Sequence, residues 1–341
     1  MARPEKMKAY PVYIDNHLLS SSEIFQKHIH GHQVFIVTQK NIAELYLGVL
    51  QKTLQDYHCD VIFIPEGEKN KNIFEWQKII EQLILKHHER STTLIALGGG
   101  VIGDMTGFAA ACYQRGVNYI QVPTTLMAQV DSSIGGKTGI NHPLAKNMLG
   151  AFHQPQCVVM DMATLTTLPE REFVSGIAEI IKYGLIWDAD FFSWLENNIQ
   201  LILEKNSAAL KYAIERSAAI KMHIVAEDER DHGLRQLLNF GHTFGHALES
   251  ATNYQTFLHG EAVAFGMKMA AELSHRHQGL SVDDVSRIEN LLKRAGLLQN
   301  PVEIPDLMSY MKRDKKTQKG ETQFILLKKI GSAIRHQNLS S

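Results

Sequence analysis

Cysteine is scarce in this chain of 341 residues, and charge of either sign is nowhere in excess. The three cysteines (Cys59, Cys112 and Cys157) are far apart and form no CxxC pair, which argues against a disulfide framework and favours a reducing compartment. Lys and Arg number 35 against 36 Asp and Glu, so no global field attracts nucleic acid or an anionic membrane. Any anion binding must therefore depend on locally clustered cations.

Long apolar runs are also lacking. No segment reaches the length of a membrane span, and the N-terminus has no apolar stretch typical of a signal peptide. We therefore expect a cytoplasmic protein that binds neither membrane nor nucleic acid. The chain is too long for one comfortable hydrophobic core, which favours two domains.

Short apolar runs alternate with amphipathic stretches in the first part of the chain. The predicted strands cover residues 34–38, 61–65, 93–97 and 119–122, and predicted helices cover 41–54 and 72–87. This alternation indicates βαβ units and a mainly parallel sheet. We predict that residues 1–160 form a Rossmann-like α/β domain that binds NAD.

Long amphipathic segments dominate after about residue 160. The predicted helices cover residues 170–185, 191–203, 208–230, 237–252, 260–278 and 281–295, and a strand-like run follows near residue 324. We predict that residues 161–341 form a predominantly α-helical domain that binds metal and substrate. No flexible linker separates the two halves, so we expect the active site between them.

A glycine-rich turn, Leu97-Gly-Gly-Gly-Val-Ile-Gly-Asp104, follows a predicted strand and opens a helix. Glycine lets the backbone approach a phosphate, and a helix N-terminus offers unpaired N–H groups and positive potential. The spacing is not GxGxxG, so a plain tight turn is an equal alternative, with Asp104 as an ordinary helix-start carboxylate. Upstream, Glu68 and Lys71 could reach a nucleotide, although such a segment is more often a solvated loop.

A second motif spans residues 121–141 and 145–147. Hydroxyl side chains, one carboxylate, a Gly-Gly turn and two lysines gather there, which is typical of a phosphate cradle. A polar loop is the alternative, but Lys137 follows Gly-Gly and precedes Thr-Gly, a backbone that is costly in a mere connector. No glycine stands five residues before Gly136, so we reject a P-loop nucleotidase.

Histidines gather in the third motif. His242 and His246 stand four residues apart on a predicted helix, His259 opens the next helix, and Glu179 and Lys182 lie among apolar neighbours. One glutamate with two or three histidines suits Zn²⁺ or a similar ion. A lone helical histidine is more often a core residue, but three with adjacent glycines favour metal. Which histidines ligate stays open from the residues alone.

Further cations suit an anionic substrate. Candidates are Lys182, Lys221, Arg235, Arg115 and the Asp-Lys-Lys run at residues 314–316, each of which alone would by default be a solvated charge. Arg235 precedes His242 by two helical turns, so its guanidinium could hold a carboxylate in a bidentate pair beside the metal.

Taken together, these motifs resemble the 3-dehydroquinate synthase family of the sugar-phosphate cyclase superfamily. Blocks such as GGGVIGDMTGFAAACYQRG, VPTTLMAQVDSSIGGKTGIN, NFGHTFGHALE and LHGEAVAFGM follow in order between about residues 30 and 330. The resemblance implies an NAD- and metal-dependent carbon–oxygen lyase of the shikimate pathway. Its reaction converts 3-deoxy-D-arabino-heptulosonate 7-phosphate to 3-dehydroquinate and phosphate by transient oxidation at C5, β-elimination, re-reduction and aldol closure.

The resemblance also implies site residues. Glu179, His242 and His259 would bind Zn²⁺ or Co²⁺, and His246 would contact a substrate hydroxyl. Asp131, Lys182 and Asn239 would contact substrate hydroxyls, and Lys221 and Arg235 would contact the carboxylate. The phosphate would be contacted by Lys137, Asn147, Lys315 and Arg115, the last from the second subunit of a homodimer. The NAD site would comprise Glu68, Lys71, Gly100, Val101, Ile102, Gly103, Asp104, Thr124, Thr125, Lys137, Lys146, Thr164, Thr167, Leu168 and Glu172.

One departure and three alternatives remain. Gln39 stands where some family members carry an acid that holds the ribose, and Lys40 beside it could tolerate a 2′-phosphate, which leaves NADP open. A cyclase for a substrate without a carboxylate would have no use for Lys221 with Arg235. A metal-dependent polyol dehydrogenase would accumulate NADH, and a regulatory nucleotide-binding module would bind NAD without turnover.

Overall fold

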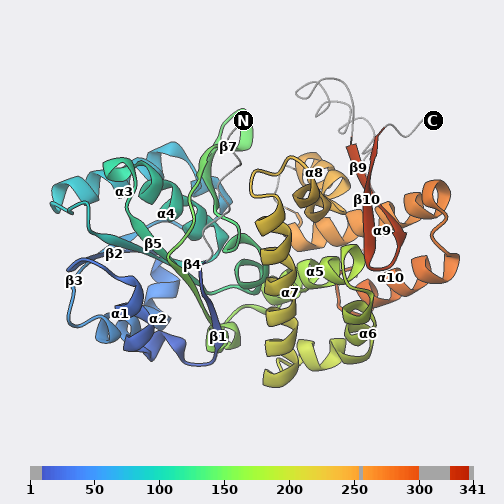
Figure 1. Cartoon of the computed structure of the whole chain (residues 1–341), viewed down its shortest axis with the longest axis horizontal. Helices are drawn as coiled ribbons and strands as arrows, with labels where there is room; N and C mark the ends of the chain where they lie inside the picture. Colours follow the sequence, from blue (N-terminus) through green and yellow to red (C-terminus); the bar gives the residue numbers. More distant parts are fainter. Residues whose placement is uncertain (1–9, 253–255, 299–322, 338–341) are drawn as a thin grey trace. The chain divides into compact units, whose positions relative to one another are not determined.

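The computed structural model describes residues 10–252, 256–298 and 323–337, and the chain divides into two compact units (Figure 1). We call Met1–Leu168 the N-terminal unit and Pro169–Ser341 the C-terminal unit. Lys315 and its neighbours lie outside the described residues.

The N-terminal unit is built on a six-stranded sheet with strand order β1-β8-β5-β4-β2-β3, and every strand pair in it is parallel. Its strands are β1 (Val12–Asp15), β2 (Gln33–Thr38), β3 (His58–Phe63), β4 (Thr93–Gly98), β5 (Asn118–Pro123) and β8 (Cys157–Asp161). Its longer helices are α1 (Ser22–His28), α2 (Lys40–Thr53), α3 (Ile73–Leu85) and α4 (Gly100–Cys112). The predicted parallel α/β fold is confirmed.

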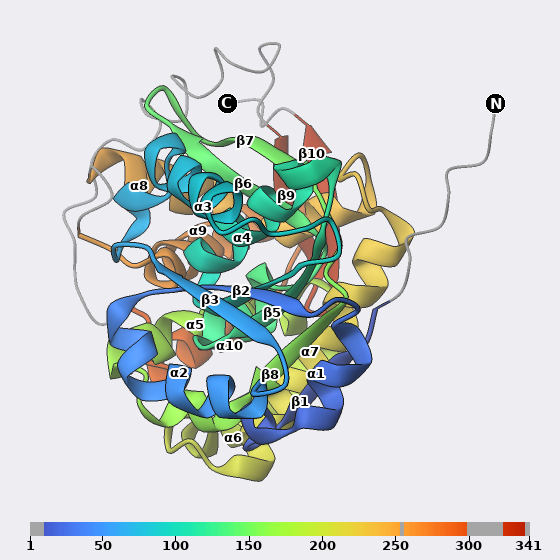
Figure 2. The same ribbon diagram turned by 90° about the vertical axis from the view of Figure 1, so that its left-hand side faces the viewer.

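Alternation along the strands divides the core into two layers. Phe35 and Val37 of β2 point to one face, while Val34 and Ile36 point to the other, and all four are buried. Figure 2 shows α1 and α2 on one face of the sheet and α3 and α4 on the other. Because both faces are covered, the central strands β2, β4 and β5 are buried along nearly their whole length and are mostly apolar, as is typical of a parallel sheet.

Four strands of the N-terminal unit were missing from the sequence-based expectations. β1 and β8 extend the sheet at one edge, and β6 (Lys137–His142) pairs with β7 (Ala145–Phe152) as an antiparallel hairpin. The lysine-containing segment is therefore a hairpin and not a polar loop. Its glycines hid it, because glycine weakens a strand signal; Gly139 and Gly150 face each other where the two backbones come close.

The C-terminal unit is mainly helical, as predicted. Its helices are α5 (Glu170–Ile186), α6 (Ala189–Leu203), α7 (Ser207–Glu227), α8 (His242–Ala251), α9 (His259–Gln278) and α10 (Val282–Arg294), and strands β9 (Gln323–Lys329) and β10 (Ser332–Gln337) form a hairpin. Among the described residues, no helix is both long and apolar enough to cross a bilayer.

One predicted helix of this unit was wrong. The stretch 237–252 is broken: a 3-10 helix covers Leu234–Asn239, and α8 begins only at His242. Gly241 lies between them with φ 80°, which a helix cannot contain. The break has a consequence for function, because it places His242 at the first position of a helix.

Candidate functional site

Close helix packing brings distant parts of the C-terminal unit together. At Gly260, in the first turn of α9, an added Cβ would lie 1.9 Å from the backbone oxygen of Ser175 in α5. The Gly260 N–H donates to the Ser175 hydroxyl at 3.0 Å. At Gly241, a Cβ would lie 2.6 Å from a side-chain carbon of Met267 in α9. Glycine at these two positions therefore permits the approach of α5, α8 and α9.

Glu179, His242 and His259 meet where these helices approach. Each offers one ligand atom, and the three atoms lie within 4.8 Å of one another. Nε2 of His242 lies 3.7 Å from Oε1 of Glu179, and the rings of His242 and His259 are 5.3 Å apart between centroids. A carboxylate oxygen and two imidazole nitrogens at this spacing suit a divalent cation with open positions for substrate oxygen.

The orientation of His242 is set by a backbone carbonyl. Its Nδ1–H donates to the oxygen of Phe240 at 3.2 Å, which directs Nε2 toward Glu179. Burial above all, and then the positive charge of Lys182 and the two neighbouring histidines, hold the pKa of His242 well below its usual value. The imidazole is therefore neutral at neutral pH, which is the form that binds a metal.

Glu179 is fully buried on α5. The Lys182 ammonium lies against its Oε2 as an ion pair, but among the described residues neither carboxylate oxygen accepts a well-formed hydrogen bond. A buried carboxylate normally has its oxygens satisfied by donors or a cation. The residues present therefore fit a metal ion next to Glu179.

Two more side chains complete this cluster. His246 is exposed on α8, with its ring centroid 5.4 Å from that of His242 and 6.0 Å from that of His259, so the structure brings it to the predicted ligands. Glu249, which sequence reasoning missed, is 6% exposed and accepts from Nδ1 of His259 at 3.4 Å. His246, Glu249 and His259 form a second group with ligand atoms within 4.8 Å.

Lys221 and Arg235, the predicted carboxylate partners, are buried at 5% and 3% exposure in the C-terminal unit. Lys221 belongs to α7, and Arg235 belongs to the 3-10 helix before α8. The Arg235 guanidinium donates from Nη1 to the Glu229 carbonyl at 2.7 Å, which orients it through a neutral acceptor. Asn239, at the end of the same 3-10 helix, is exposed.

In the N-terminal unit, α4 begins directly after β4 with Gly99 as its N-cap, so residues 100–104 form its first turn and the start of the second. Asp104 is paired with Lys71 rather than acting as a helix-start carboxylate: the ammonium lies 2.6 Å from Oδ2. The same ammonium donates to Oδ1 of Asn147 at 2.6 Å. Lys71 is 4% exposed, although residues 65–69 of the same segment are exposed.

Electrostatics keeps Lys71 charged. Burial by itself would lower the pKa of this ammonium, but the carboxylates of Asp104 and Glu68 outweigh burial and raise the pKa above its usual value. The predicted nucleotide contacts Glu68, Lys71 and Asp104 and the predicted phosphate contact Asn147 are therefore one connected group of charges and amides.

The remaining predicted nucleotide contacts occupy several elements. Thr124 follows β5, and its buried hydroxyl has no hydrogen-bond partner among the described residues, as expected of a group that faces a ligand. Thr125 accepts from the Ala128 N–H, and Thr167 and the Thr164 carbonyl both contact the Tyr46 hydroxyl. Lys137 begins β6, Lys146 lies on β7, Leu168 ends the N-terminal unit, and Glu172 lies in the first turn of α5 in the C-terminal unit.

Two further predicted substrate contacts lie in turns of the N-terminal unit. Asp131 lies in a π-helical turn, Ala128–Ser132. Arg115 is exposed in the turn after α4, with φ 63°, in the left-handed region.

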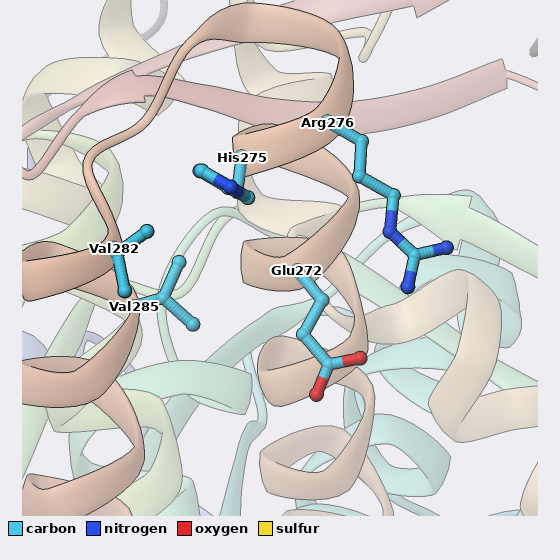
Figure 3. A pocket seen from close by; sticks show the side chains of 5 residues that line it. All are labelled: Glu272, His275, Arg276, Val282 and Val285. Carbon is cyan, nitrogen blue, oxygen red and sulfur yellow. The ribbon is translucent and has the colours of Figure 1, made fainter.

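A shallow pocket elsewhere contains no predicted site residue. It lies between α9 and α10 and is lined by Glu272, His275, Arg276, Val282 and Val285 (Figure 3). The His275 ring nitrogen Nδ1 donates to the Leu280 carbonyl at 2.7 Å, so this histidine supports the turn between the helices. The candidate chemistry therefore belongs to the Glu179 cluster and the Lys71 group.

Comparisons with known proteins agree with this geometry. The family models described as 3-dehydroquinate synthase N-terminal and C-terminal match residues 61–175 and 176–317. A 3-dehydroquinate synthase of Nitrosococcus oceani is 53% identical over 330 residues, covering 96% of this chain and 92% of that protein.

Two solved structures are similar along nearly the whole chain. ValA, the 2-epi-5-epi-valiolone synthase of Streptomyces hygroscopicus with NAD⁺ and Zn²⁺ bound, has a TM-score of 0.90 at 28% identity, covering 100% of this chain and 96% of its own. A 2-deoxy-scyllo-inosose synthase complexed with carbaglucose-6-phosphate, NAD⁺ and Co²⁺ has a TM-score of 0.86 at 26% identity, covering 97% and 92%. With both family models matched in order, this chain belongs to the 3-dehydroquinate synthase family.

Proposed function

We propose that this protein is a 3-dehydroquinate synthase, a carbon–oxygen lyase that converts 3-deoxy-D-arabino-heptulosonate 7-phosphate to 3-dehydroquinate and inorganic phosphate. The alcohol at C5 becomes a ketone as its hydride passes to NAD⁺. The C6 proton and the phosphate are then lost across a new double bond. The hydride returns to C5, and the ring opens and closes by an intramolecular aldol step, so NAD⁺ is regenerated.

The observation that carries this proposal is the convergence of Glu179, His242 and His259. These three residues would hold a divalent ion, Zn²⁺ or Co²⁺, which when bound would acidify and orient substrate hydroxyls. Lys182 lies against Glu179 and is almost fully buried, so its ammonium is positioned to donate to a substrate hydroxyl beside the carboxylate. His246 is exposed next to the ligands, which suits a contact with substrate rather than a structural role.

Basic side chains would bind the two anionic groups of the substrate, its carboxylate and its phosphate. The buried Arg235 guanidinium has the planar fork that matches a substrate carboxylate, and the buried Lys221 adds a second positive charge. Lys137 and Asn147 would contact the phosphate, together with Lys315. The pairing of Lys221 with Arg235 favours the seven-carbon keto acid over cyclase substrates that lack a carboxylate.

The nucleotide would bind at the start of α4. Unpaired N–H groups and the positive end of the helix suit a pyrophosphate, and Gly100 allows close approach. NAD⁺ in ValA and in the 2-deoxy-scyllo-inosose synthase supports this cofactor. Gln39 is the N-cap residue of α2 and Lys40 opens that helix, so the preference for NAD over NADP stays a prediction.

We also propose a homodimer in which Arg115 reaches the phosphate of the partner subunit's substrate. Its exposure and its place in a tight turn after α4 support a contact outside its own surface. The cytoplasmic location stays a prediction.

A phosphate-release assay tests the proposed function. With the seven-carbon substrate, NAD⁺ and Zn²⁺, we expect stoichiometric phosphate and 3-dehydroquinate without net NADH. Chelator or removal of NAD⁺ should abolish release. Net NADH accumulation would instead indicate a polyol dehydrogenase, and NAD binding without turnover would indicate a regulatory module.

A further inference from the structure

Asn141 occupies an irregular position in the β6–β7 hairpin. The strand register shifts between Ile140 and His142, so Asn141 lies at a bulge where the ladder is interrupted. A bulge releases backbone groups from the ladder and re-aims a side chain. The Asn141 N–H donates to the Lys71 carbonyl at 2.8 Å, and Asn141 forms an isolated parallel bridge with Asn72. The hairpin is thereby attached to the segment that carries Glu68 and Lys71.

The Asn141 side chain uses both ends of its amide. Nδ2 donates to Oε1 of Glu68 at 2.8 Å, and Oδ1 accepts from the Asn147 N–H at 2.9 Å. Asn147 has φ 53°, a left-handed conformation that is uncommon outside glycine and needs support from its surroundings. Asn141 supports it by accepting from the backbone N–H of Asn147, and Lys71 supports it by donating to the Asn147 side-chain oxygen.

We propose that Asn141 is a positioning residue that couples the nucleotide contacts Glu68 and Lys71 to the phosphate contact Asn147. This inference rests on the proposed function, which assigns those three residues to the two ligands. Ligand bound at Glu68 and Lys71 orders the Asn141 amide, and the ordered amide holds Asn147 in its strained conformation. The first ligand to bind then loses the conformational entropy of ordering the hairpin, and the second ligand binds to a hairpin that is already ordered. The two ligands therefore bind with positive cooperativity.

The test measures the affinity for NAD⁺ calorimetrically in the absence and presence of millimolar inorganic phosphate. We expect phosphate to tighten NAD⁺ binding by about fivefold or more in the unaltered protein. In Asn141→Ala, the ratio of the two dissociation constants should fall to within about twofold of one. Asn197→Ala, an exposed asparagine on α6 whose amide bonds only its own helix, is the matched control and should keep the full ratio.

A second variant separates the two ends of the amide. Asn141→Asp keeps the acceptor for the Asn147 N–H but replaces the donor to Glu68 with a repelling charge. We expect it to weaken NAD⁺ binding more than it weakens phosphate binding measured alone, because the donor to Glu68 is lost and the acceptor for the Asn147 N–H is kept.

The outcomes distinguish this inference from the proposed function. A ratio near one in the unaltered protein, or a full ratio in Asn141→Ala, overturns the role of Asn141 even if 3-dehydroquinate is formed. Absence of NAD⁺ binding in the unaltered protein overturns the proposed function itself.

Discussion

The two units position their functional side chains in different ways. In the C-terminal unit, the Glu179 cluster comes from helices that pack closely through glycine, and the rings of His242 and His259 each donate to an acceptor. In the N-terminal unit, Asn147 lies on an exposed hairpin and depends on hydrogen bonds from Lys71 and Asn141.

The difference indicates where preorganisation comes from. Helix packing buries apolar surface and keeps a ligand set in place without any bound group. A mostly exposed strand such as β7 has lower local stability, so its geometry depends on polar contacts and on ligands. We therefore expect that NAD⁺ does not change the affinity for metal. By contrast, we expect that NAD⁺ changes the affinity for phosphate.

The largest effect should come from Glu179→Gln. This change keeps the shape but removes the anionic ligand and leaves the Lys182 ammonium without its buried partner. We expect loss of bound metal after dialysis and a fall in phosphate release of about 10³-fold, equivalent to about 4 kcal/mol.

Glu272→Gln on α9 is the control for Glu179→Gln, because Glu272 lines the shallow pocket away from the ligands (Figure 3). It should bind metal and turn over normally. Full metal occupancy in Glu179→Gln would contradict the assignment of Glu179 as a ligand.

Lys71→Met should follow. It removes the buried cation shared by Asp104 and Asn147, and we expect a loss of about 3 kcal/mol of unfolding free energy together with weaker NAD⁺ binding. Urea denaturation and NAD⁺ titration measure the two effects. The neighbouring exposed Lys69→Met should change neither.

A double variant sharpens this prediction. In Lys71→Met with Asp104→Asn, the unpaired carboxylate is gone, so part of the stability should return. Strict additivity of the two losses would show that the ion pair contributes nothing.

Arg235→Ala should lower turnover more than tenfold, because the substrate carboxylate would lose its forked partner at a cost of about 2 kcal/mol or more. Steady-state phosphate release measures it, with the exposed Arg276→Ala as control. Near-normal kinetics in Arg235→Ala would contradict the proposed contact between Arg235 and the substrate carboxylate. That result would favour a substrate without a carboxylate.

The smallest effect concerns stability in the N-terminal unit. His88 is 2% exposed, and burial, which outweighs the attraction of Asp60, lowers its pKa below the usual 6.5. As the pH falls, His88 therefore takes up a proton in the unfolded chain before it does so in the folded protein. The stability from neutral His88 is present above about pH 6.5 and is lost as pH falls below it, by at most about 1.4 kcal/mol per pH unit.

Urea denaturation between pH 7.5 and pH 5.5 on either side of that value tests this prediction. His88→Gln should flatten the fall in stability, whereas the exposed His32→Gln should leave it unchanged. An identical slope in His88→Gln would assign the pH dependence to other groups.

Much of the fold followed from local patterns. Short apolar runs predicted β2, β4 and β5, and amphipathic spacing predicted α5, α9 and α10, because both patterns are properties of a short stretch of backbone. The break at Gly241 was missed because the apolar period continues across it. β6 and β7 were missed because their pairing involves glycines and few β-branched residues.

The site divides in the same way. Residue types and motif order were sufficient to nominate Glu179, His242 and His259. Glu249 and Asn141 carry no motif that marks their roles: one depends on the approach of α8 and α9, and the other on a bulge in a hairpin.

By itself, the sequence determined an α/β half, a helical half and the chemical set of one glutamate and several histidines, since these depend on periodicity and composition. Only the tertiary structure decided that Glu179 faces His242, that Lys71 is buried on Asp104 and that Asn141 joins two segments. The physical reason is that local conformation is set by neighbours in the chain, whereas convergence is set by which surfaces can approach closely enough to exclude water.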